Sequence, residues 1–290
     1  MRTNLLGRTG ATVSALGFGG APAGLSGYLG DYDAAEAASQ REVERAIRRA
    51  LEVGVTYFDT APGYGGGLSE AVFGRGLSGS RDGVFLATKT PRTLFGDPAG
   101  IRASLEESLR LLGTDHVDLL QFHGGWWSEP DAAAVLEHGL EMYERLRDEG
   151  KTRFLGFTAE GPNGAVERLI ATGRIDTVMM CFNLTYQAAG AYRNRSMPPE
   201  TALSLARAQN MGVVTMRTLT SGVFQRWLGQ IGAPDFDWNA ALLGFVLSHP
   251  QVDVALVGMR TADEVEQNAR VVEEGLFRVD MAAVHDGYGR

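Results

Sequence analysis

The most constraining feature of the sequence is a regular alternation of short apolar runs and longer amphipathic segments. The short runs predict buried strands, and the helix-spaced apolar residues after each run predict helices. Eight such units follow one another, with strands expected at residues 15–20, 55–58, 84–89, 117–123, 152–157, 177–181, 213–216 and 254–257. Strands separated by helices are most simply parallel. Eight parallel units predict an α/β fold, a single closed (β/α)8 TIM barrel over residues 1–290, rather than an open doubly wound sheet.

Segments outside the eight strands complete this prediction. Residues 3–15 predict an N-terminal β-hairpin, because 4–6 and 12–14 flank a turn-rich link at 7–10. Residues 21–38 predict a long polar loop. The expected helices cover residues 39–53, 68–77, 98–112, 131–149, 164–172, 199–209, 222–249 and 262–272. No linker or low-complexity stretch divides the chain, which favours one domain.

Charge and composition argue against several functional classes. The formal net charge is -8 with both signs interspersed, which disfavours nucleic acid or an anionic membrane as the main partner. Cys181 is the only cysteine, so an intrachain disulfide and a multi-cysteine metal site are both excluded. The first residues lack the apolar core of a signal peptide, and no stretch approaches transmembrane length. A soluble cytoplasmic protein is therefore expected.

Ionisable side chains follow three consecutive predicted strands. Asp59 follows the second strand, Lys89 the third and His123 the fourth, while Tyr64 lies on the loop after Asp59. Taken alone, Asp59 could cap the next helix and Tyr64 could pack on its loop. In α/β barrels, however, the chemistry lies at the carboxyl ends of the strands, where neighbouring strands bring such groups together. We therefore interpret the four residues as one catalytic group.

These four residues suit proton transfer at a carbonyl or alcohol oxygen. An unperturbed tyrosine has a pKa of about 10, and a nearby cation favours the phenolate and lowers that pKa. Lys89 can be that cation, held by a salt bridge to Asp59, and His123 can orient a carbonyl oxygen by a hydrogen bond. Tyr64 then serves as the general acid or base. It supplies a proton but no electrons, so a hydride carrier is required.

The ordered motifs resemble the aldo-keto reductase superfamily over nearly the whole chain. The matching segments are Leu-Gly-Arg-Thr-Gly at 6–10, Val-Ser at 13–14, Asp-Thr-Ala-x-x-Tyr-Gly at 59–65, Ser-Glu at 69–70, Lys89, Ser-Leu at 108–109, Leu-Gly at 112–113, Asp-Leu at 118–119 with His123, Gly-Lys at 150–151 with Gly156, and residues 258–268. The resemblance implies that Asp59, Tyr64, Lys89 and His123 form the catalytic tetrad, with Tyr64 as general acid. It also implies an extended nicotinamide dinucleotide, usually NADP(H), bound without a Rossmann domain.

The resemblance also implies contacts to the nicotinamide, and here the chain departs from the family. Thr158 and Ala159 stand where the family usually has Ser-Asn, so a hydroxyl is retained and an amide is lost. Met179 replaces a glutamine, and Met216 replaces an aromatic residue that often stacks under the ring. Asn183 matches a recurrent asparagine. A less polar nicotinamide site, with fewer side-chain amides, is therefore expected.

Two further segments resemble the parts of the family that hold the phosphates and adenosine. The implied contacts are Arg217, Thr218, Leu219 and Ser221 in a pyrophosphate loop, Gly258 and Arg260 at a helix start, and Gln267 with Asn268 beside the adenine. Free backbone N–H groups at the helix start suit a phosphate. Glu264 stands where many NADP-preferring members carry arginine. NADP(H) is the expected cofactor, with NAD(H) as the alternative.

Aromatic residues on the strand-end loops are candidates for the substrate pocket. Tyr28, Trp126 and Trp127 are expected there, with one of the two tryptophans as a packing residue; Tyr32 and Trp227 also lie on such loops. The expected substrate is an aldehyde or ketone, or in reverse a sugar-like alcohol. Two alternatives stay open at this point. One is a regulatory or redox-sensing subunit that binds the cofactor with poor turnover, and the other is a metal-dependent hydrolase using Asp59 and His123.

Overall fold

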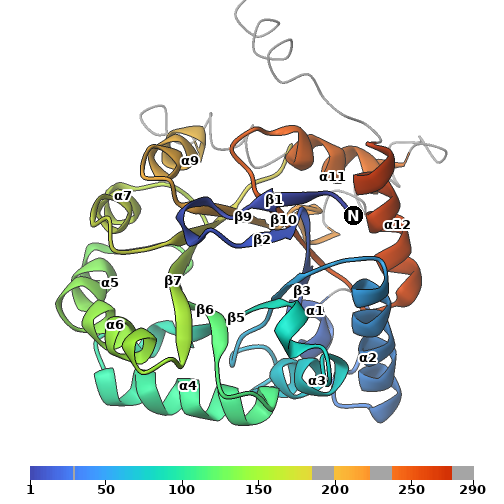
Figure 1. The fold of residues 1–290 in the computed structure, drawn as a ribbon, viewed down its shortest axis with the longest axis horizontal. Coiled ribbons are helices and arrows are strands. Elements are labelled where there is room, and N and C mark those ends of the chain that lie inside the picture. The colour runs from blue at the N-terminus through green and yellow to red at the C-terminus, as the bar shows by residue number, and fades with distance from the viewer. Residues whose placement is uncertain (29, 185–198, 223–236, 276–290) are drawn as a thin grey trace, which may run out of the picture.

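In a computed structural model, which describes residues 1–28, 30–184, 199–222 and 237–275, parallel strands close into a barrel surrounded by helices (Figure 1). Around the barrel the strands follow in the order β10-β3-β4-β5-β6-β7-β8-β9. Their bounds are β3 (Leu16–Gly19), β4 (Tyr57–Asp59), β5 (Phe85–Pro91), β6 (Val117–His123), β7 (Thr152–Ala159), β8 (Thr177–Cys181), β9 (Gly212–Met216) and β10 (Val254–Gly258). The predicted (β/α)8 barrel is confirmed.

The predicted N-terminal hairpin is also confirmed, with β1 (Thr3–Leu5) antiparallel to β2 (Thr12–Ser14). Leu6 enters the apolar cluster inside the barrel. Gly7 has a φ of 48° and lies so near β9 that a Cβ there would come within 2.2 Å of the backbone N of Gly212. The hairpin therefore covers the amino-terminal end of the barrel and leaves the carboxyl end for a cavity.

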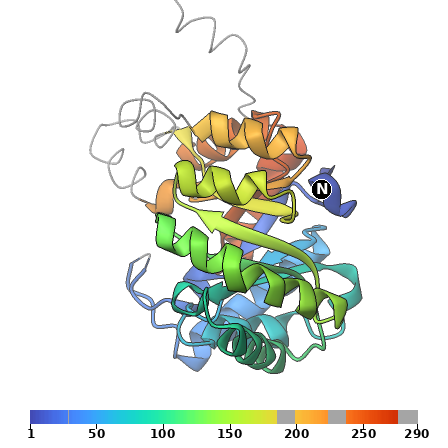
Figure 2. The same ribbon diagram turned by 90° about the vertical axis from the view of Figure 1, so that its left-hand side faces the viewer.

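The helices form an outer layer around the strands (Figures 1 and 2). In α2, the residues Val43, Ala46, Ile47 and Ala50 are buried at helical spacing, so one face packs on the barrel. The helix bounds are α1 (Ala21–Gly24), α2 (Ala37–Glu52), α3 (Leu68–Gly76), α4 (Pro98–Leu112), α5 (Glu129–Ala134), α6 (Leu140–Asp148), α7 (Gly164–Ala171), α9 (Pro199–Ala208), α11 (Trp238–Ser248) and α12 (Ala262–Glu274). None of the helices in the described ranges is long and apolar enough to cross a membrane.

Some elements differ from the prediction. The helix expected at 131–149 is interrupted by a π-helical segment, Val135–Gly139. A Cβ on Gly139 would come within 2.6 Å of the Phe95 carbonyl oxygen, so the π-helical segment ends at a close approach to the backbone of Phe95. The loop expected at 21–38 begins with the short helix α1. The helix expected at 222–249 lies partly outside the described residues, and a single domain over 1–290 stays a prediction.

Strand β5 extends further than expected, and this matters for the site. It ends at Pro91, so Lys89 lies within the strand rather than after it. Lys89 pairs in register with Gln121 of β6. Because alternate residues of a barrel strand face inward, Lys89 is held inside the barrel wall and is only 1% exposed.

Candidate active site

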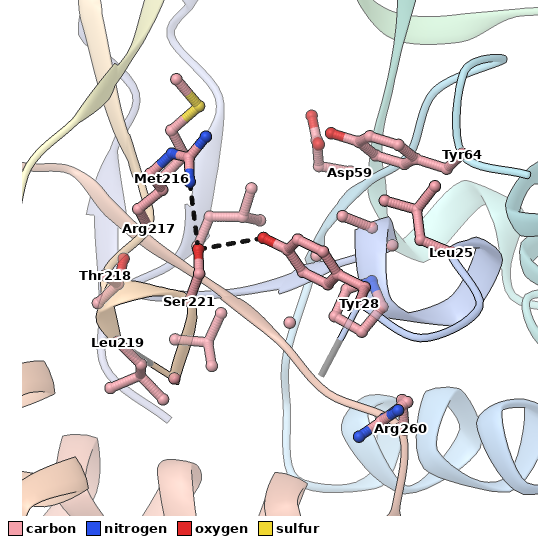
Figure 3. A pocket seen from close by; sticks show the side chains of 18 of the residues that line it. Leu25, Tyr28, Asp59, Tyr64, Met216, Arg217, Thr218, Leu219, Ser221 and Arg260 are labelled. Carbon is pink, nitrogen blue, oxygen red and sulfur yellow. Dashed lines mark hydrogen bonds between the residues drawn. The ribbon is translucent and has the colours of Figure 1, made fainter. Parts of the chain in front are cut away.

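A cavity of about 500 Å³ opens at the carboxyl ends of the strands (Figure 3). Among the residues expected at the site, the cavity is lined by Tyr28, Asp59, Tyr64, His123, Met216, Arg217, Thr218, Leu219, Ser221, Gly258 and Arg260. The remaining lining residues include Met179 and Glu264, which the sequence analysis noted, and Glu160, which it did not. The expected catalytic and phosphate-binding segments therefore share one cavity.

An ion pair between Asp59 and Lys89 is buried beneath this cavity. The Lys89 ammonium donates to Asp59 Oδ1 and, at 2.8 Å, to the carbonyl oxygen of Thr60. Burial raises the pKa of Asp59, although Lys89 and Gln121 oppose the shift. Burial acts to lower the pKa of Lys89, but Asp59 and Tyr64 outweigh it, so the pKa is raised. Lys89 is therefore a fixed cation at neutral pH.

Tyr64 and His123 lie above this ion pair. The Lys89 Nζ is 5.0 Å from the centre of the Tyr64 ring, and the Tyr64 and His123 rings are perpendicular with centres 5.6 Å apart. Burial raises the pKa of Tyr64, and Lys89 only partly offsets this. The expectation that Lys89 brings this pKa below its ordinary value is therefore wrong, because desolvation of the phenol is the larger effect.

His123 is neutral at physiological pH. Burial, and then the nearby charge of Lys89, lower its pKa to about 3. A neutral imidazole can still donate one hydrogen bond. The side chain therefore suits a role in holding an oxygen atom rather than in supplying a full positive charge.

On the opposite side of the cavity, polar groups bind one another (Figure 3). The Arg217 guanidinium forms a forked ion pair with Glu160, with Nη2 to Oε1 at 2.7 Å and Nε to Oε2 at 2.9 Å. The Ser221 hydroxyl accepts from Tyr28 Oη at 3.1 Å and from Arg217 Nη1 at 3.5 Å. This cluster joins the loops that follow β3, β7 and β9. Arg217 is thus committed mainly to Glu160.

Two expected nicotinamide contacts lie away from the cavity. The Thr158 hydroxyl is buried and donates to the carbonyl oxygen of Gly124 at 2.7 Å. The Asn183 amide donates to the carbonyl oxygen of Arg217 at 2.9 Å. Neither side chain is part of the cavity lining, so Thr158 acts on a loop backbone and Asn183 supports the loop after β9. Met179 and Met216 do line the cavity, which matches the less polar surface expected there.

The two tryptophans do not form the pocket wall in the described part of the chain. Trp127 is 5% exposed, donates from Nε1 to the carbonyl oxygen of Thr158 at 2.7 Å, and stacks on Phe95. Trp126 is 58% exposed and is also absent from the cavity lining. Of the three expected pocket residues, Tyr28 alone lines the described cavity. Trp227 lies outside the described residues.

At the other end of the cavity, the start of α12 is held by its own side chains. Glu264 Oε2 accepts from the backbone N of Arg260 at 2.6 Å and of Thr261 at 3.2 Å, and Thr261 Oγ1 accepts from Glu264 N, which is a capping box. Asn268 is buried and donates to the carbonyl oxygen of Glu264, while Gln267 is exposed; neither lines the cavity. The backbone donors expected to meet a phosphate are thus partly occupied by Glu264.

Sequence reasoning missed two residues of this site. Gln121 Nε2 donates to Asp59 Oδ2 at 2.8 Å, and Glu160 follows the last residue of β7. A signal for Gln121 was available: it is polar in an apolar strand and lies two residues before His123, on the same strand face. Glu160 follows a strand end, as Asp59 was expected to, but its partner Arg217 is too distant in sequence to suggest the pair.

The alternative of a metal-dependent hydrolase required Asp59 and His123 as ligands. Both carboxylate oxygens of Asp59 are instead hydrogen-bonded, Oδ1 to Lys89 and Oδ2 to Gln121. Over the described residues, no three or more His, Cys, Asp and Glu side chains gather where they could hold a metal ion. The contacts of Asp59 are therefore those of an ion-pair partner of Lys89 rather than those of a metal ligand.

Comparison with known proteins agrees with this geometry. The sequence profile of the aldo/keto reductase family matches residues 15–242. L-galactose dehydrogenase of Arabidopsis thaliana is 28% identical, with 93% of this chain and 87% of the relative covered. The methylglyoxal reductase YeaE of Escherichia coli is 30% identical, with 87% of each chain covered.

Solved structures show the same fold. The holo form of an aldo-keto reductase from Bacillus halodurans superposes with a TM-score of 0.73 at 25% identity, covering 94% of this chain and 91% of that one. An aldo/keto reductase from Klebsiella pneumoniae in complex with NADP and acetate gives a TM-score of 0.71 at 24% identity, with 93% and 89% covered. The chain therefore belongs to the aldo/keto reductase family of NAD(P)H-dependent oxidoreductases.

Proposed function

We propose that this protein reduces an aldehyde or ketone to an alcohol with NADP(H), or oxidises a sugar-like alcohol in the reverse direction, with Tyr64 as the general acid or base. One observation carries the proposal. Tyr64 and His123 line the same cavity, and Lys89 lies behind the phenol with its charge fixed by Asp59. This arrangement matches the needs of proton transfer at a carbonyl oxygen.

The protonation states favour Tyr64 as the acid. Because burial raises its pKa, the phenol keeps its proton at neutral pH and can donate it to a carbonyl oxygen. The phenolate that remains gains from the adjacent Lys89 charge, so the product of proton transfer is stabilised where it forms. His123 is neutral and can hold the carbonyl oxygen by a hydrogen bond while the Tyr64 proton moves.

The rest of the cavity fits a nicotinamide dinucleotide. When bound, that cofactor supplies the hydride that the side chains lack. Arg217 and Arg260 provide cations, and Thr218 and Ser221 provide hydroxyls, along the same wall. A Cβ on Gly258 would come within 2.4 Å of Pro22, which also lines the cavity, so a side chain has no room at this position. NADP(H) is the proposed cofactor, with NAD(H) as the alternative because Glu264 lines the adenosine end.

The proposed substrate is a small carbonyl compound or a sugar-like alcohol. Relatives carry the names L-galactose dehydrogenase, methylglyoxal reductase and D-threo-aldose 1-dehydrogenase, which span both classes. Besides the polar Tyr64 and His123, the cavity is lined by the apolar side chains of Met179, Met216 and Leu25, and Leu25 lies beside Tyr64 (Figure 3). This mixture suits a substrate with one reactive oxygen and a short carbon chain.

The test measures loss of NADPH absorbance with a panel of aldehydes, ketones and sugars. Tyr64→Phe removes the phenolic proton and is expected to lower kcat by about 100-fold to 10,000-fold, while the dissociation constant for NADPH stays within about twofold. Tyr28→Phe is the matched control, because it removes a cavity hydroxyl that bonds Ser221 rather than lying over Lys89. Equal rates for wild type and Tyr64→Phe on every responsive substrate would contradict the mechanism. Tight NADPH binding without turnover would favour the regulatory alternative.

A further inference from the structure

Gln121 is a polar side chain in the middle of a buried strand. It belongs to β6 and is 0% exposed. Its Nε2 donates to Asp59 Oδ2 at 2.8 Å, on the opposite side of the carboxylate from Lys89. Its Oε1 is buried and has no hydrogen-bond partner among the described residues. Leaving a buried acceptor without a partner costs stability, so an apolar residue would pack here at lower cost.

The Asp59 carboxylate depends on this amide. Lys89 satisfies one oxygen and Gln121 the other, so together they fix the carboxylate plane across β4, β5 and β6. Both contacts favour the ionised form of Asp59, against the effect of burial. Lys89 in turn depends on Asp59 for its own charge and position next to Tyr64. A chain of contacts thus runs from Gln121 through Asp59 and Lys89 to Tyr64.

We propose that Gln121 is a positioning residue for the reaction proposed above: its amide holds the Asp59 carboxylate in the orientation that pairs with Lys89. The inference rests on the proposed function only for its effect on turnover. The contact between Gln121 and Asp59 can be tested in the free protein, without cofactor or substrate.

Other titratable groups surround this carboxylate and must be considered in any pH measurement. Tyr57 lies on the same strand face beneath Asp59, and burial raises its pKa well above the ordinary value. Tyr64 lies on the cavity side, and His123 is close enough to feel the charge of Lys89. Burial raises the pKa of Glu70 on α3, and the charge of Lys89 is among the effects that oppose this shift. Tyr57 and Tyr64 titrate above neutral pH and His123 near pH 3, while burial raises the pKa of Asp59 and of Glu70, so an acid-side inflection above that of His123 points to one of these two carboxyl groups.

The sequence offers a direct probe of this carboxylate. Its two lysines are Lys89, which is buried, and Lys151, which lies at the surface. Protein labelled with 13C at the lysine ε-carbon therefore gives two signals, and Lys151→Arg assigns them. Protonation of Asp59 changes the environment of Lys89 and appears as an acid-side inflection of its signal. In Gln121→Leu this inflection is expected to move up by about one pH unit, because the ionised carboxylate loses a donor.

Kinetics provide the second measurement. In Gln121→Leu, kcat for carbonyl reduction is expected to fall about tenfold, while the dissociation constant for NADPH stays within about twofold, because Gln121 does not line the cavity. Gln121→Glu restores a donor while it shares one proton with Asp59. Its kcat is therefore expected to exceed that of Gln121→Leu, and most clearly at acid pH.

Thr177→Val is the matched control. The Thr177 hydroxyl is buried without a hydrogen-bond partner among the described residues, and both Thr177 and Gln121 lie against Gly156, whereas the Asp59 carboxylate is bonded to Lys89 and Gln121. This variant should leave the Lys89 inflection and kcat unchanged. If Gln121→Leu does not fold, Gln121→Met replaces it in the comparison with Gln121→Glu.

Three outcomes overturn the proposal. They are an unchanged Lys89 inflection in the apolar variant, equal kcat for the apolar and glutamate variants at every pH, or a parallel loss of kcat and NADPH affinity. Failure of the proposed function has a different signature, which is a wild type inactive on every carbonyl tested. In that case the 13C titration still decides whether Gln121 sets the state of Asp59.

Discussion

The two sides of the cavity rim differ in how their polar groups are used. On the side formed by β4, β5 and β6, Asp59, Lys89 and Gln121 are buried and bonded to one another, and Tyr64 and His123 face the cavity above them. On the side formed by β7, β8 and β9, two of the polar groups expected to contact the cofactor are bound to other parts of the protein. Thr158 bonds a loop carbonyl there, and Arg217 is held by Glu160.

This difference indicates that the two sides have different tasks. The first side keeps a buried cation in place at a cost of desolvation, an arrangement that is typical of sites where the charge acts on a neighbouring group. The second side presents Met179 and Met216 with an ion pair at its edge, which is a surface that can adapt to a bound ring. Variants on the first side should therefore act on both stability and turnover, and those on the second mainly on binding.

The largest effect is expected for Lys89→Met. It leaves the Asp59 carboxylate buried without a cation, which costs about 3–5 kcal/mol of unfolding free energy at neutral pH. The loss should shrink as the pH falls, because Asp59 then takes up a proton. Denaturant unfolding at pH 7 and pH 5 measures it. Lys151→Met is the control, since its contact with Glu106 is at the surface and should matter little. Similar losses for both lysines would remove the distinction between the two sites.

A smaller effect, on binding alone, is expected for Glu160→Gln. The change releases Arg217 and removes a negative charge from the cavity wall, so NADPH should bind about threefold to fivefold more tightly with kcat unchanged. Calorimetric titration measures this. Glu144→Gln breaks a comparable pair with Arg174 that is not part of the cavity, and it should leave NADPH affinity as it is. Weaker binding in Glu160→Gln would show that the ion pair itself supports the site.

A still smaller effect is expected at the adenosine end. Glu264→Gln removes a negative charge next to Arg260 and the start of α12. The ratio of NADP⁺ to NAD⁺ affinity should rise about twofold to threefold, since an extra phosphate gains more from the change than a hydroxyl does. Parallel titrations with the two cofactors check it. Asp263→Asn, on the same helical turn but outside the cavity lining, serves as the control.

No effect at all is expected from His123 between pH 5 and 8. Its pKa of about 3 keeps the imidazole neutral over that range, so the rate of carbonyl reduction should show no inflection near pH 6.5. At alkaline pH the rate should fall as Tyr64 loses its proton, and alcohol oxidation should rise there instead. An inflection near pH 6.5 that disappears in His123→Gln would show that the imidazole titrates during turnover.

Much of the first side could be predicted from the sequence, because local rules place it. Asp59 and His123 lie at strand ends, and parallel strands bring their carboxyl ends to one rim. Tyr64 follows Asp59 after a short turn, so the turn keeps it at the same rim of the barrel. The predicted direction of the Tyr64 pKa shift was wrong. The shift depends on how deeply the folded barrel buries the phenol, and the neighbouring charges in the sequence do not reveal that burial.

The second side depends on contacts between distant segments, and the sequence does not specify them. The Thr158 hydroxyl could contact either the nicotinamide or the protein backbone. In the structure it donates to the carbonyl oxygen of Gly124, which follows β6. One of Trp126 and Trp127 was expected near the substrate because both follow His123, but the Trp127 ring turns back to stack on Phe95 and Trp126 lies outside the cavity lining. Such choices follow from packing over the whole barrel rather than from residue spacing.

The N-terminal hairpin has a consequence for how the chain reaches this structure. Gly7 packs against Gly212, and Leu16 pairs in register with Ala255 of β10. A chain synthesised from its amino end therefore makes the N-terminal hairpin and β3 long before β9 and β10, which they contact, have been made. The contacts of Leu6 with β9 and of Leu16 with β10 cannot form until those strands have emerged. Closure of the barrel is thus a late event in synthesis, and an incomplete chain is a candidate for aggregation.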